Sequence, residues 1–533
     1  MVSLIRDLIH NLIYLLVALP LALSLPAIAQ EDILHRGNVG EPESLDPAKS
    51  AGVWEAHIQR DLFEGLLAEA ADGELIPGVA ESWEISDDGT VYTFQLRRDA
   101  RWSDGSPVTA GDFEFAFKRL LEPATASRYA SILYPIVGAE DYNTGRAASP
   151  DTVGVKAIDP GTLEITLNSA TPYFLQQLAH HTAYPVSQAN VRQYGSHWVK
   201  PGNMVSNGAY RLAEWLPQAH VKVVKNRHFH AAEDVAIDTV YYYPTEDRSA
   251  AVRRFRSGEL DLQYDVPDDQ IPWIQENLPG QLIISPYLGI YYYSLNLKRK
   301  PLDDVRVRQA LALGILREVL VDKITGAGEV AAYSLVPPGV SDYRPAYAEF
   351  KDWSSPQRQA EAKRLMAEAG YGPDNPLALT LSYNTSENHK KIAIAIAAMW
   401  KQLGVQTQLT NAELKVHYNN LQAHDFDVAR AGWIADYNDA QNFLFLLESN
   451  NPELNYSQYA NPQYDALMAQ AARTVELDRR AELLHQAEAI AMADMPYIPI
   501  YYYVSKNLVS PAVRGWKPNI KDVHPSRWMS LAR

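Results

Sequence analysis

The chain has 533 residues, a net charge of −16 and no cysteine, and it is too long for one hydrophobic core, so we expect two or three domains. Its 64 acidic against 48 basic residues argue against nucleic acid or anionic lipid as a partner, because both bind to basic surfaces. The lack of cysteine excludes disulfides, thiolate metal sites and a cysteine nucleophile.

The N-terminus has the pattern of a secretory signal peptide. Arg6 precedes an almost entirely apolar run, Leu12–Leu25, and Ala27-Ile28-Ala29 places small residues where a signal peptidase cleaves. The run is short for a membrane-spanning helix, and no cysteine follows that would carry a lipid anchor. We therefore expect residues 1–29 to be removed, with Gln30 as the first mature residue; an uncleaved membrane anchor is the alternative.

The N-terminal half is expected to be rich in strands. Tyr92–Leu96 and Leu163–Leu167 alternate apolar with polar residues, as a strand with one buried face does. Between these segments, Thr109 is suited to cap a helix that begins near Asp112.

The C-terminal half is expected to alternate helices with strands. Apolar residues recur at helical spacing in several segments, and glycine or proline follows as a stop signal. Such alternation is typical of an α/β domain. The expected helices are Asp303–Ile324, Pro356–Gly370, Ile392–Leu403 and Glu476–Ala493, and the expected strands are Val405–Thr410 and Ile500–Val504.

Tyrosine is unusually frequent, with 31 residues against 12 phenylalanines. The triplets Tyr241–Tyr243, Tyr291–Tyr293 and Tyr501–Tyr503 would each place tyrosine on both faces of a sheet. Tyrosine suits the wall of a binding cleft because its ring is apolar and its tip is polar. The β-propensity of tyrosine explains any single one of them, whereas a cleft explains the whole set at least as well.

The segment Phe426–Asn438 combines an apolar run with two opposite charges, Arg430 and Asp436. Because a buried charge is costly unless it is paired, the two either pair with each other or meet the opposite charges of a zwitterionic ligand. In a straight strand these residues would lie about 20 Å apart. An extended tripeptide spans only about 10 Å, so a small ligand that meets both charges requires a bent strand or a leaning Arg430 side chain.

Three segments resemble the periplasmic oligopeptide-binding proteins of ABC importers, which belong to family 5 of the extracellular solute-binding proteins. They are Phe426–Asn438, the sequence Glu-Pro-Glu-Ser-Leu-Asp-Pro at Glu41–Pro47, and Ala100–Asp112. The resemblance implies that Asp436 receives the α-ammonium group of a peptide. It also implies that Arg430 helps to receive the peptide carboxylate.

The same resemblance implies an α/β fold with two lobes, the large type II fold of periplasmic binding proteins, together with an extra smaller domain. The lobes would be discontinuous in sequence and would close on the ligand about a hinge. The implied divisions are 1–29 for the signal peptide, 30–63, 188–288 and 505–533 for the first lobe, 64–187 for the extra domain, and 289–504 for the second lobe.

Further site residues follow from the resemblance. Main-chain hydrogen bonds to an extended peptide ignore side-chain identity, and glycine lets two backbones approach closely. An ordinary turn at Gly52 and a core position for Trp433 are the alternatives. The implied backbone segments are Ala51, Gly52 and Val53, and Gly432, Trp433 and Ile434; the implied side chains are Tyr129, Tyr287, Tyr292, Asn384 and, at the carboxylate end, His389.

The chain departs from the family pattern at two places. Some members carry a lysine where this chain has Thr325, and its absence argues against ligands of four or more residues. Cysteines that are paired across the site in some members align with Gly289 and Ile434, and both are absent together. In addition, Asn384–Trp400 resembles the branch that binds murein tripeptide, whereas Ala431-Gly432-Trp433 follows the general peptide branch.

We therefore expect a monomeric periplasmic protein without a cofactor that captures short peptides and delivers them to an ABC permease; murein tripeptide binding is the alternative. The sequence has no Gly-x-Ser-x-Gly, His-Glu-x-x-His or phosphate-loop motif, which leaves a peptidase as a distant alternative. A nickel-complex binder is equally distant, because His180-His181 and His228-x-His230 lack acidic partners at ligand spacing.

Overall fold

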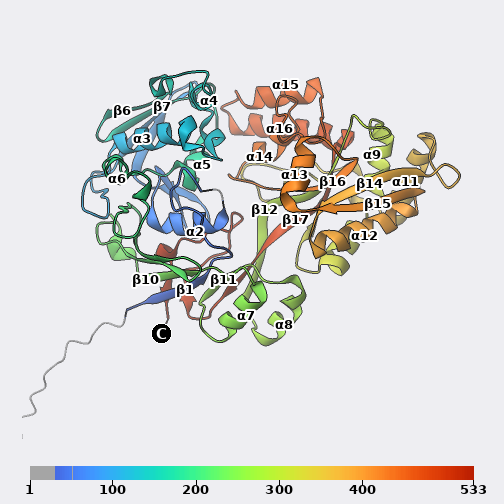
Figure 1. Cartoon of the computed structure of the whole chain (residues 1–533). Helices are drawn as coiled ribbons and strands as arrows, with labels where there is room; N and C mark the ends of the chain where they lie inside the picture. The colour runs from blue at the N-terminus through green and yellow to red at the C-terminus, as the bar shows by residue number, and fades with distance from the viewer. Residues whose placement is uncertain (1–30, 51, 533) are drawn as a thin grey trace, which may run out of the picture.

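The computed structural model describes residues 31–50 and 52–532. The predicted signal peptide, Gln30 and Ala51 therefore lie outside the described residues. Figure 1 shows two bodies, one coloured blue to green and one yellow to red, with strands that run between them. Within the described part of the chain, no helix is long and apolar enough to cross a lipid bilayer.

One mixed sheet of eleven strands extends through both bodies. The strands at the second-body end are parallel, and those at the first-body end form antiparallel hairpins. In spatial order the strands are β15 (Val405–Ala412), β14 (Leu377–Asn384), β16 (Val428–Ile434), β12 (Leu282–Leu295), β17 (Tyr497–Val509), β11 (Leu262–Tyr264), β1 (Ile33–Gly37), β10 (Thr239–Tyr243), β9 (His220–Lys225) and β8 (Tyr210–Leu216), and β13 (Val330–Ala331) pairs with β17.

The long strands β12 and β17 connect the two bodies (Figure 1). At one end β12 pairs with β16 of the second body, and at the other end the last residues of β17 pair with β11 of the first body. Two crossing strands allow one body to rotate relative to the other, as in hinge closure. The implied domain boundaries at 288/289 and 504/505 fall within these strands and remain a prediction.

The first body confirms the elements expected there. The alternating segments form β5 (Val91–Leu96) and β7 (Thr162–Thr166) of a four-stranded sheet. Thr109 and Asp112 form a reciprocal capping box at the start of α3 (Ala110–Leu121). The other elements are α2 (Val53–Leu62), β2 (Leu67–Glu69), β3 (Leu75–Pro77), β4 (Ala80–Ile85), α4 (Ala139–Asn143), β6 (Val155–Asp159), α5 (Phe174–Leu178), α6 (Gln188–Tyr194), α7 (Arg248–Arg256), α8 (Ile271–Asn277), β18 (Val513–Arg514) and β19 (Ser530–Leu531).

The helices of the second body follow the sequence pattern with one exception. The expected single helix Asp303–Ile324 is wrong, because the first helix ends at Leu313 with Gly314 as its C-cap. An added Cβ at residue 314 would lie 2.6 Å from Leu403 Cδ1, which favours glycine there. The chain resumes after Leu316 as a short helix and a π-helical turn. The helices are α9 (Val305–Leu313), α10 (Arg317–Val319), the π-helix Leu320–Thr325, α11 (Ser355–Glu368), α12 (Glu387–Lys401), α13 (Leu414–Gln422), α14 (Gln441–Leu444), α15 (Pro462–Ala471) and α16 (Leu477–Asp494).

Two large hydrophobic cores are separate from each other. One draws its buried residues from positions 288 to 502, and the other from positions 34 to 262 and 509 to 529. A third, smaller cluster lies among α7, α8 and the ends of β12 and β17. Because each body has its own core, the two bodies keep their structure when they move relative to each other.

Candidate functional site

Strand β16 has a free backbone edge between the two bodies. It pairs with β12 along its whole length, whereas β14 pairs only with its first two residues. The N–H of Ala435 donates to the carbonyl of Leu288 at 2.8 Å. Ala435 and Leu288 therefore form a hydrogen-bonded pair. Hydrogen-bonded and non-hydrogen-bonded pairs alternate along an antiparallel ladder, so the backbone N–H and C=O groups of Gly432 and Ile434 point away from β12. This edge therefore presents backbone groups with which the main chain of an extended ligand could pair as a further strand.

Arg430 lies buried beside this edge without a carboxylate partner. Its Nη2 donates to Tyr503 Oη at 2.8 Å and its Nη1 to Asn384 Oδ1 at 3.1 Å, and its guanidinium carbon lies 4.8 Å from the centre of the Tyr291 ring. Within the described residues Arg430 forms no ion pair. A guanidinium is always charged and has five N–H donors, so Arg430 retains donors for an anionic group.

His389, on the first turn of α12, lies against the same cluster. Its Nδ1 is 3.4 Å from Tyr291 Oη. Burial and then the charge of Arg430 lower the pKa of His389 to about 3. The imidazole is therefore neutral at physiological pH, where it is available for a hydrogen bond but leaves the recognition of charge to Arg430.

Asp436 follows β16, which ends at Ile434, and the N–H of Ala435 still bonds to β12, so the chain first bends at Asp436 itself. How one short ligand would reach both charges, by a bent strand or by a leaning Arg430 side chain, therefore stays a prediction. Burial raises the pKa of Asp436 to about 6, although hydrogen bonding with Tyr129 of the first body opposes the rise. Across positions 31–50 and 52–532 Asp436 forms no ion pair, and in particular none with Arg430. The two charges therefore do not satisfy each other.

Tyr129 and Tyr287 both lie close to Asp436. Burial raises the pKa of Tyr129, and the charge of Asp436 adds to the rise. Burial likewise raises the pKa of Tyr287, with smaller contributions from Asp522 and Asp436 among the charges around it. Neither hydroxyl ionises at physiological pH, so both are hydrogen-bonding walls of the space beside Asp436.

The backbone segment at Gly52 differs from the expected extended edge. Gly52 itself is extended, with φ −97° and ψ 153°, but Val53 begins helix α2 and its side chain is 50% exposed. Val53 is therefore helical and not extended as expected, but its N–H is at the start of α2 and has no partner within the helix, so its contact with a ligand main chain stays a prediction. An added Cβ at Gly52 would lie 2.3 Å from Glu55 Oε2 and 2.6 Å from the Trp54 ring, so close packing requires glycine there.

The prediction that Tyr292 lines the site is wrong. Its side chain is 1% exposed and its ring stacks on Tyr497, with the ring centroids 4.4 Å apart, so it has no surface to offer a ligand. Strand alternation explains this, because it places Tyr292 on the face of β12 opposite Tyr291. Trp433 is partly a core residue, which was the alternative to lining a ligand pocket. Its Nε1 donates to Asn442 Oδ1 at 2.9 Å, and its ring packs on Phe445.

Sequence reasoning missed three tyrosines that surround Arg430, namely Tyr291, Tyr418 and Tyr503. The triplets carried the signal for two of them, since every second tyrosine of a strand shares a face. The pattern could not show which face meets Arg430, because that depends on the register between β12 and β16. Tyr418 lies alone on α13 and had no sequence signal.

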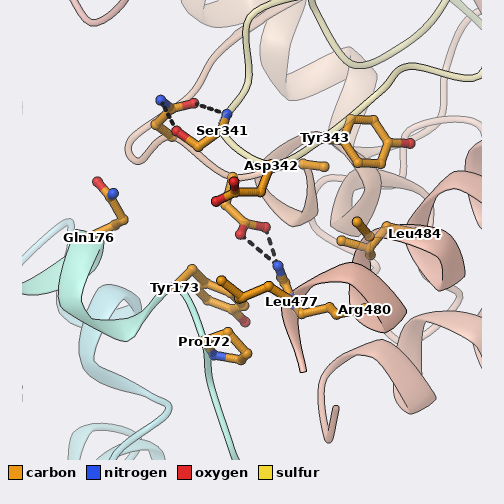
Figure 2. Close-up of a pocket in the computed structure, with 13 residues that line it drawn as sticks. Pro172, Tyr173, Gln176, Ser341, Asp342, Tyr343, Leu477, Arg480 and Leu484 are labelled. Atoms are coloured by element: carbon orange, nitrogen blue, oxygen red, sulfur yellow. Dashed lines mark hydrogen bonds and ion pairs between the residues drawn. The ribbon is translucent and has the colours of Figure 1, made fainter. Parts of the chain in front are cut away.

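A second contact between the bodies lies beside Asp436. Tyr173 of the first body stacks on Tyr437 with centroids 5.1 Å apart and planes 2° from parallel. Figure 2 shows the adjoining pocket, in which Arg480 holds Asp439 through two hydrogen bonds of 2.7 and 2.8 Å. The pocket is lined by residues of both bodies, including Pro172, Tyr173 and Gln176 from the first and Ser341, Asp342, Tyr343, Leu477, Arg480 and Leu484 from the second.

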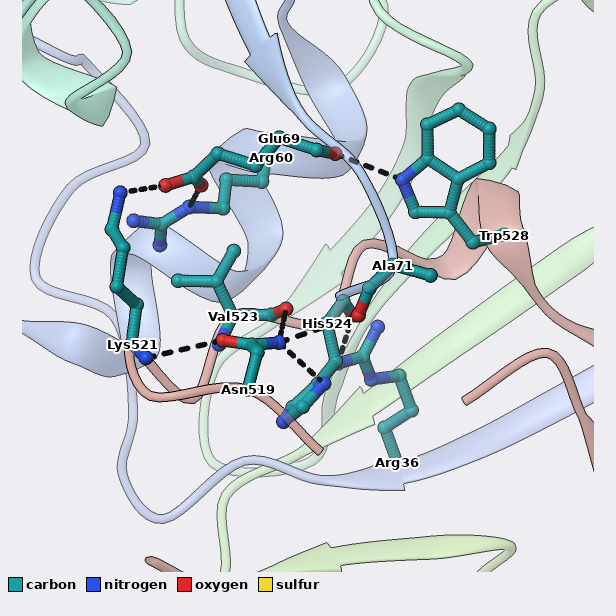
Figure 3. Close-up of polar contacts among 9 residues, drawn as sticks. All are labelled: Arg36, Arg60, Glu69, Ala71, Asn519, Lys521, Val523, His524 and Trp528. Carbon is teal, nitrogen blue, oxygen red and sulfur yellow. Dashed lines mark hydrogen bonds and ion pairs between the residues drawn. The ribbon is translucent and has the colours of Figure 1, made fainter. Parts of the chain in front are cut away.

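The C-terminal segment is fixed to the first body by a buried polar network (Figure 3). Glu69 accepts a hydrogen bond from Arg60 Nε at 3.3 Å and another from Lys521, and its carbonyl accepts one from Trp528 Nε1 at 2.9 Å. Asn519 Nδ2 donates to the carbonyl of Val523 at 2.8 Å. Two cations on one buried carboxylate make this network structural rather than ligand-binding.

The histidine clusters are also structural. His230 Nε2 lies 2.8 Å from Glu64 Oε2, and His180 Nδ1 lies 2.8 Å from Thr182 Oγ1. Burial lowers the pKa of both His180 and His181. In the part of the chain that the structure describes, no group of three or more histidine or acidic side chains is placed to hold a metal ion.

Two bodies with separate cores, two crossing strands and a pair of uncompensated opposite charges between them define a two-lobed binding protein of mixed α/β structure. The model of the bacterial extracellular solute-binding proteins, family 5, matches residues 74–455. The chain belongs to this family.

Two relatives and one solved structure are similar to this chain over nearly their whole lengths. The periplasmic oligopeptide-binding protein OppA of Escherichia coli K12 is 41% identical, with 93% of this chain and 92% of OppA aligned. The periplasmic murein peptide-binding protein MppA of the same organism is 40% identical, with 95% and 94% aligned. The solved unliganded open form of MppA superimposes with a TM-score of 0.84 and covers 94% of this chain and 98% of that structure.

Proposed function

We propose that this protein captures short peptides in the periplasm and delivers them to an ABC importer. The observation that carries the proposal is the pair Arg430 and Asp436, two opposite charges without protein counter-ions beside a free strand edge. A peptide zwitterion supplies both missing charges, and its main chain supplies the missing strand. The relatives OppA and MppA, named for oligopeptide and murein peptide binding, support this ligand class.

The arrangement explains binding without catalysis. Asp436 would hold the α-ammonium group, Arg430 the carboxylate, and Gly432 and Ile434 the main chain of the ligand. None of these contacts involves a side chain of the ligand, so they would bind peptides of many different sequences. Family membership supports a binding protein rather than an enzyme.

Murein tripeptide is the second candidate ligand. The identity to MppA, 40%, is almost the same as the identity to OppA, 41%, so the comparisons favour neither. Both ligand classes carry a free ammonium group and a carboxylate. Native mass spectrometry of the protein purified from the periplasm, with the ligand released and sequenced, distinguishes a linear peptide from a cell-wall fragment.

Calorimetry with trialanine and N-acetyl-trialanine tests the proposal. We expect the wild type to bind trialanine at least a hundredfold more tightly, because acetylation removes the ammonium charge that Asp436 requires. The Asp436→Asn variant should lose this preference. Asp303→Asn, which removes an exposed carboxylate elsewhere in the second body, is the matched control and should bind as the wild type does. Equal binding of both peptides by the wild type would contradict the proposal.

A further inference from the structure

Glu329 is an acidic group near Tyr503, a hydrogen-bond partner of Arg430, that the contacts described so far leave unused. Strand β13 pairs Val330 with Tyr502 in antiparallel register, which places Glu329 beside Tyr503, the tyrosine whose hydroxyl binds Arg430. Burial raises the pKa of Tyr503, and the negative charge of Glu329 adds to the rise. The Glu329 carboxylate thus lies at the end of the site where Arg430 would receive a carboxylate.

The contacts of Glu329 fix its position but do not balance its charge. Its Oε2 accepts a hydrogen bond from Thr325 Oγ1 at 2.8 Å and another from the N–H of Ala327 at 3.2 Å. Both donors are neutral. Among residues 31–50 and 52–532, no lysine, arginine or histidine lies within ion-pair distance of Glu329. The site therefore holds a positioned, partly buried carboxylate whose counter-ion the protein does not supply.

We infer that Glu329 selects peptides whose last residue carries a primary amine on its side chain. This inference rests on the proposed function. A lysine-like residue whose carboxylate meets Arg430 places an ammonium group at the end of a flexible carbon stem, which would let that group reach the Glu329 carboxylate near Tyr503. In this arrangement the side-chain ammonium of the last ligand residue would pair with Glu329, and the carboxylate of the same residue would pair with Arg430.

The test compares Ala-Ala-Lys with Ala-Ala-norleucine, which has a similar stem without the charge, by calorimetry at low ionic strength. We expect the wild type to prefer the lysine peptide about tenfold, as for a partly desolvated charge pair. Glu329→Gln should abolish the preference without weakening Ala-Ala-norleucine, because the amide oxygen still accepts from Thr325 and Ala327. Thr325→Lys should also abolish it, since the introduced ammonium would pair with Glu329.

Asp322→Asn is the matched control, because it removes an exposed carboxylate from the same turn, and it should keep the tenfold preference. Equal affinities of the two peptides for the wild type, or an unchanged preference in Glu329→Gln, would overturn the inference while the proposed function stands. If neither peptide binds to the wild type, both fail. Raising the salt concentration should reduce the preference, since screening weakens a partly exposed pair.

Discussion

Tyr173 and Tyr437 stack in parallel across the two bodies, and this contact lies one residue from Asp436. The guanidinium of Arg480 lies 5.2 Å from the centre of the Tyr173 ring, and Asp439 fixes that guanidinium. The turn that carries the ammonium-binding candidate is therefore packed against the opposite body. We therefore expect the Tyr173 ring to help position Asp436 when the two bodies close on a ligand.

Replacing Tyr173 by alanine should weaken peptide affinity about three- to tenfold, because an aromatic pair contributes about 0.5–1.5 kcal/mol beyond its buried area. Tyr173→Phe keeps the ring and should bind as the wild type does. Calorimetry with trialanine measures the difference, and thermal unfolding shows whether both variants remain folded. Unchanged affinity in Tyr173→Ala would show that the stack has no part in closure.

Peptide affinity should fall as the pH falls below about 6. An ammonium ligand requires ionised Asp436, and burial raises the pKa of this carboxyl to about 6 in the empty protein. Affinity should therefore be constant near pH 7 and decrease by about tenfold per pH unit well below pH 6. His389 stays neutral across this range because burial lowers its pKa to about 3. Calorimetry between pH 4.5 and 7 checks the slope, and a flat profile would contradict the role of Asp436.

The empty protein should show the opposite trend in stability from the same group. The pKa of Asp436 is about 6 in the folded state, higher than its ordinary value of about 4. Between these two pH values the folded state therefore binds more protons than the unfolded state. Its contribution to the free energy of unfolding is fully present below about pH 4 and is lost as the pH rises through 6. The difference in thermal stability between wild type and Asp436→Asn should follow this curve, and a difference independent of pH would exclude it.

The sequence allowed the α/β class, most second-body helices and the two charges of the site to be predicted. Arg430 and Asp436 were recognisable because charges within an apolar run are rare without partners. Their spacing allowed either a bent strand or a leaning arginine side chain, and the chain first bends only at Asp436, so this choice stays a prediction. The error at Asp303–Ile324 arose because a glycine within a helical pattern can either continue the helix or end it, and at Gly314 the helix ends.

The remaining parts of the site depend on contacts between distant segments. Tyr292 was expected to line the site, yet the register of β12 against β16 brings Tyr291 to Arg430 instead. The stacking of Tyr173 on Tyr437 depends on how the two bodies meet. No local pattern encodes either relationship, because both are set by tertiary packing.

Gly289 and Ile434 are directly paired on β12 and β16, so cysteines at both positions should form a disulfide. They belong to a pair without mutual backbone hydrogen bonds, where the Cα atoms lie about 4.5 Å apart, within the disulfide range. An added Cβ at Gly289 would lie 2.3 Å from Ile434 Cδ1, a contact that Ile434→Cys removes. The double variant should lose two free thiols on oxidation, as mass spectrometry after alkylation would detect.

The single variant Gly289→Cys is the control for that experiment. It retains the Ile434 side chain 2.3 Å from the added Cβ and forms no disulfide, so we expect lower thermal stability than in the oxidised double variant. Two free thiols in the oxidised double variant would contradict the register.

Gly432→Ala should weaken peptide binding by displacing the bond between Tyr503 and Arg430. An added Cβ would lie 2.8 Å from Tyr503 Oη and 3.2 Å from Arg430 Nη2, closer than a carbon atom tolerates. We expect about a tenfold loss of affinity, because the guanidinium moves from its place at the strand edge. Tyr503→Phe removes the crowded oxygen, so the double variant should lose less than the sum of the two single losses. Calorimetry on the four proteins measures this coupling, and additive losses would show that Gly432 acts on the ligand independently of Tyr503.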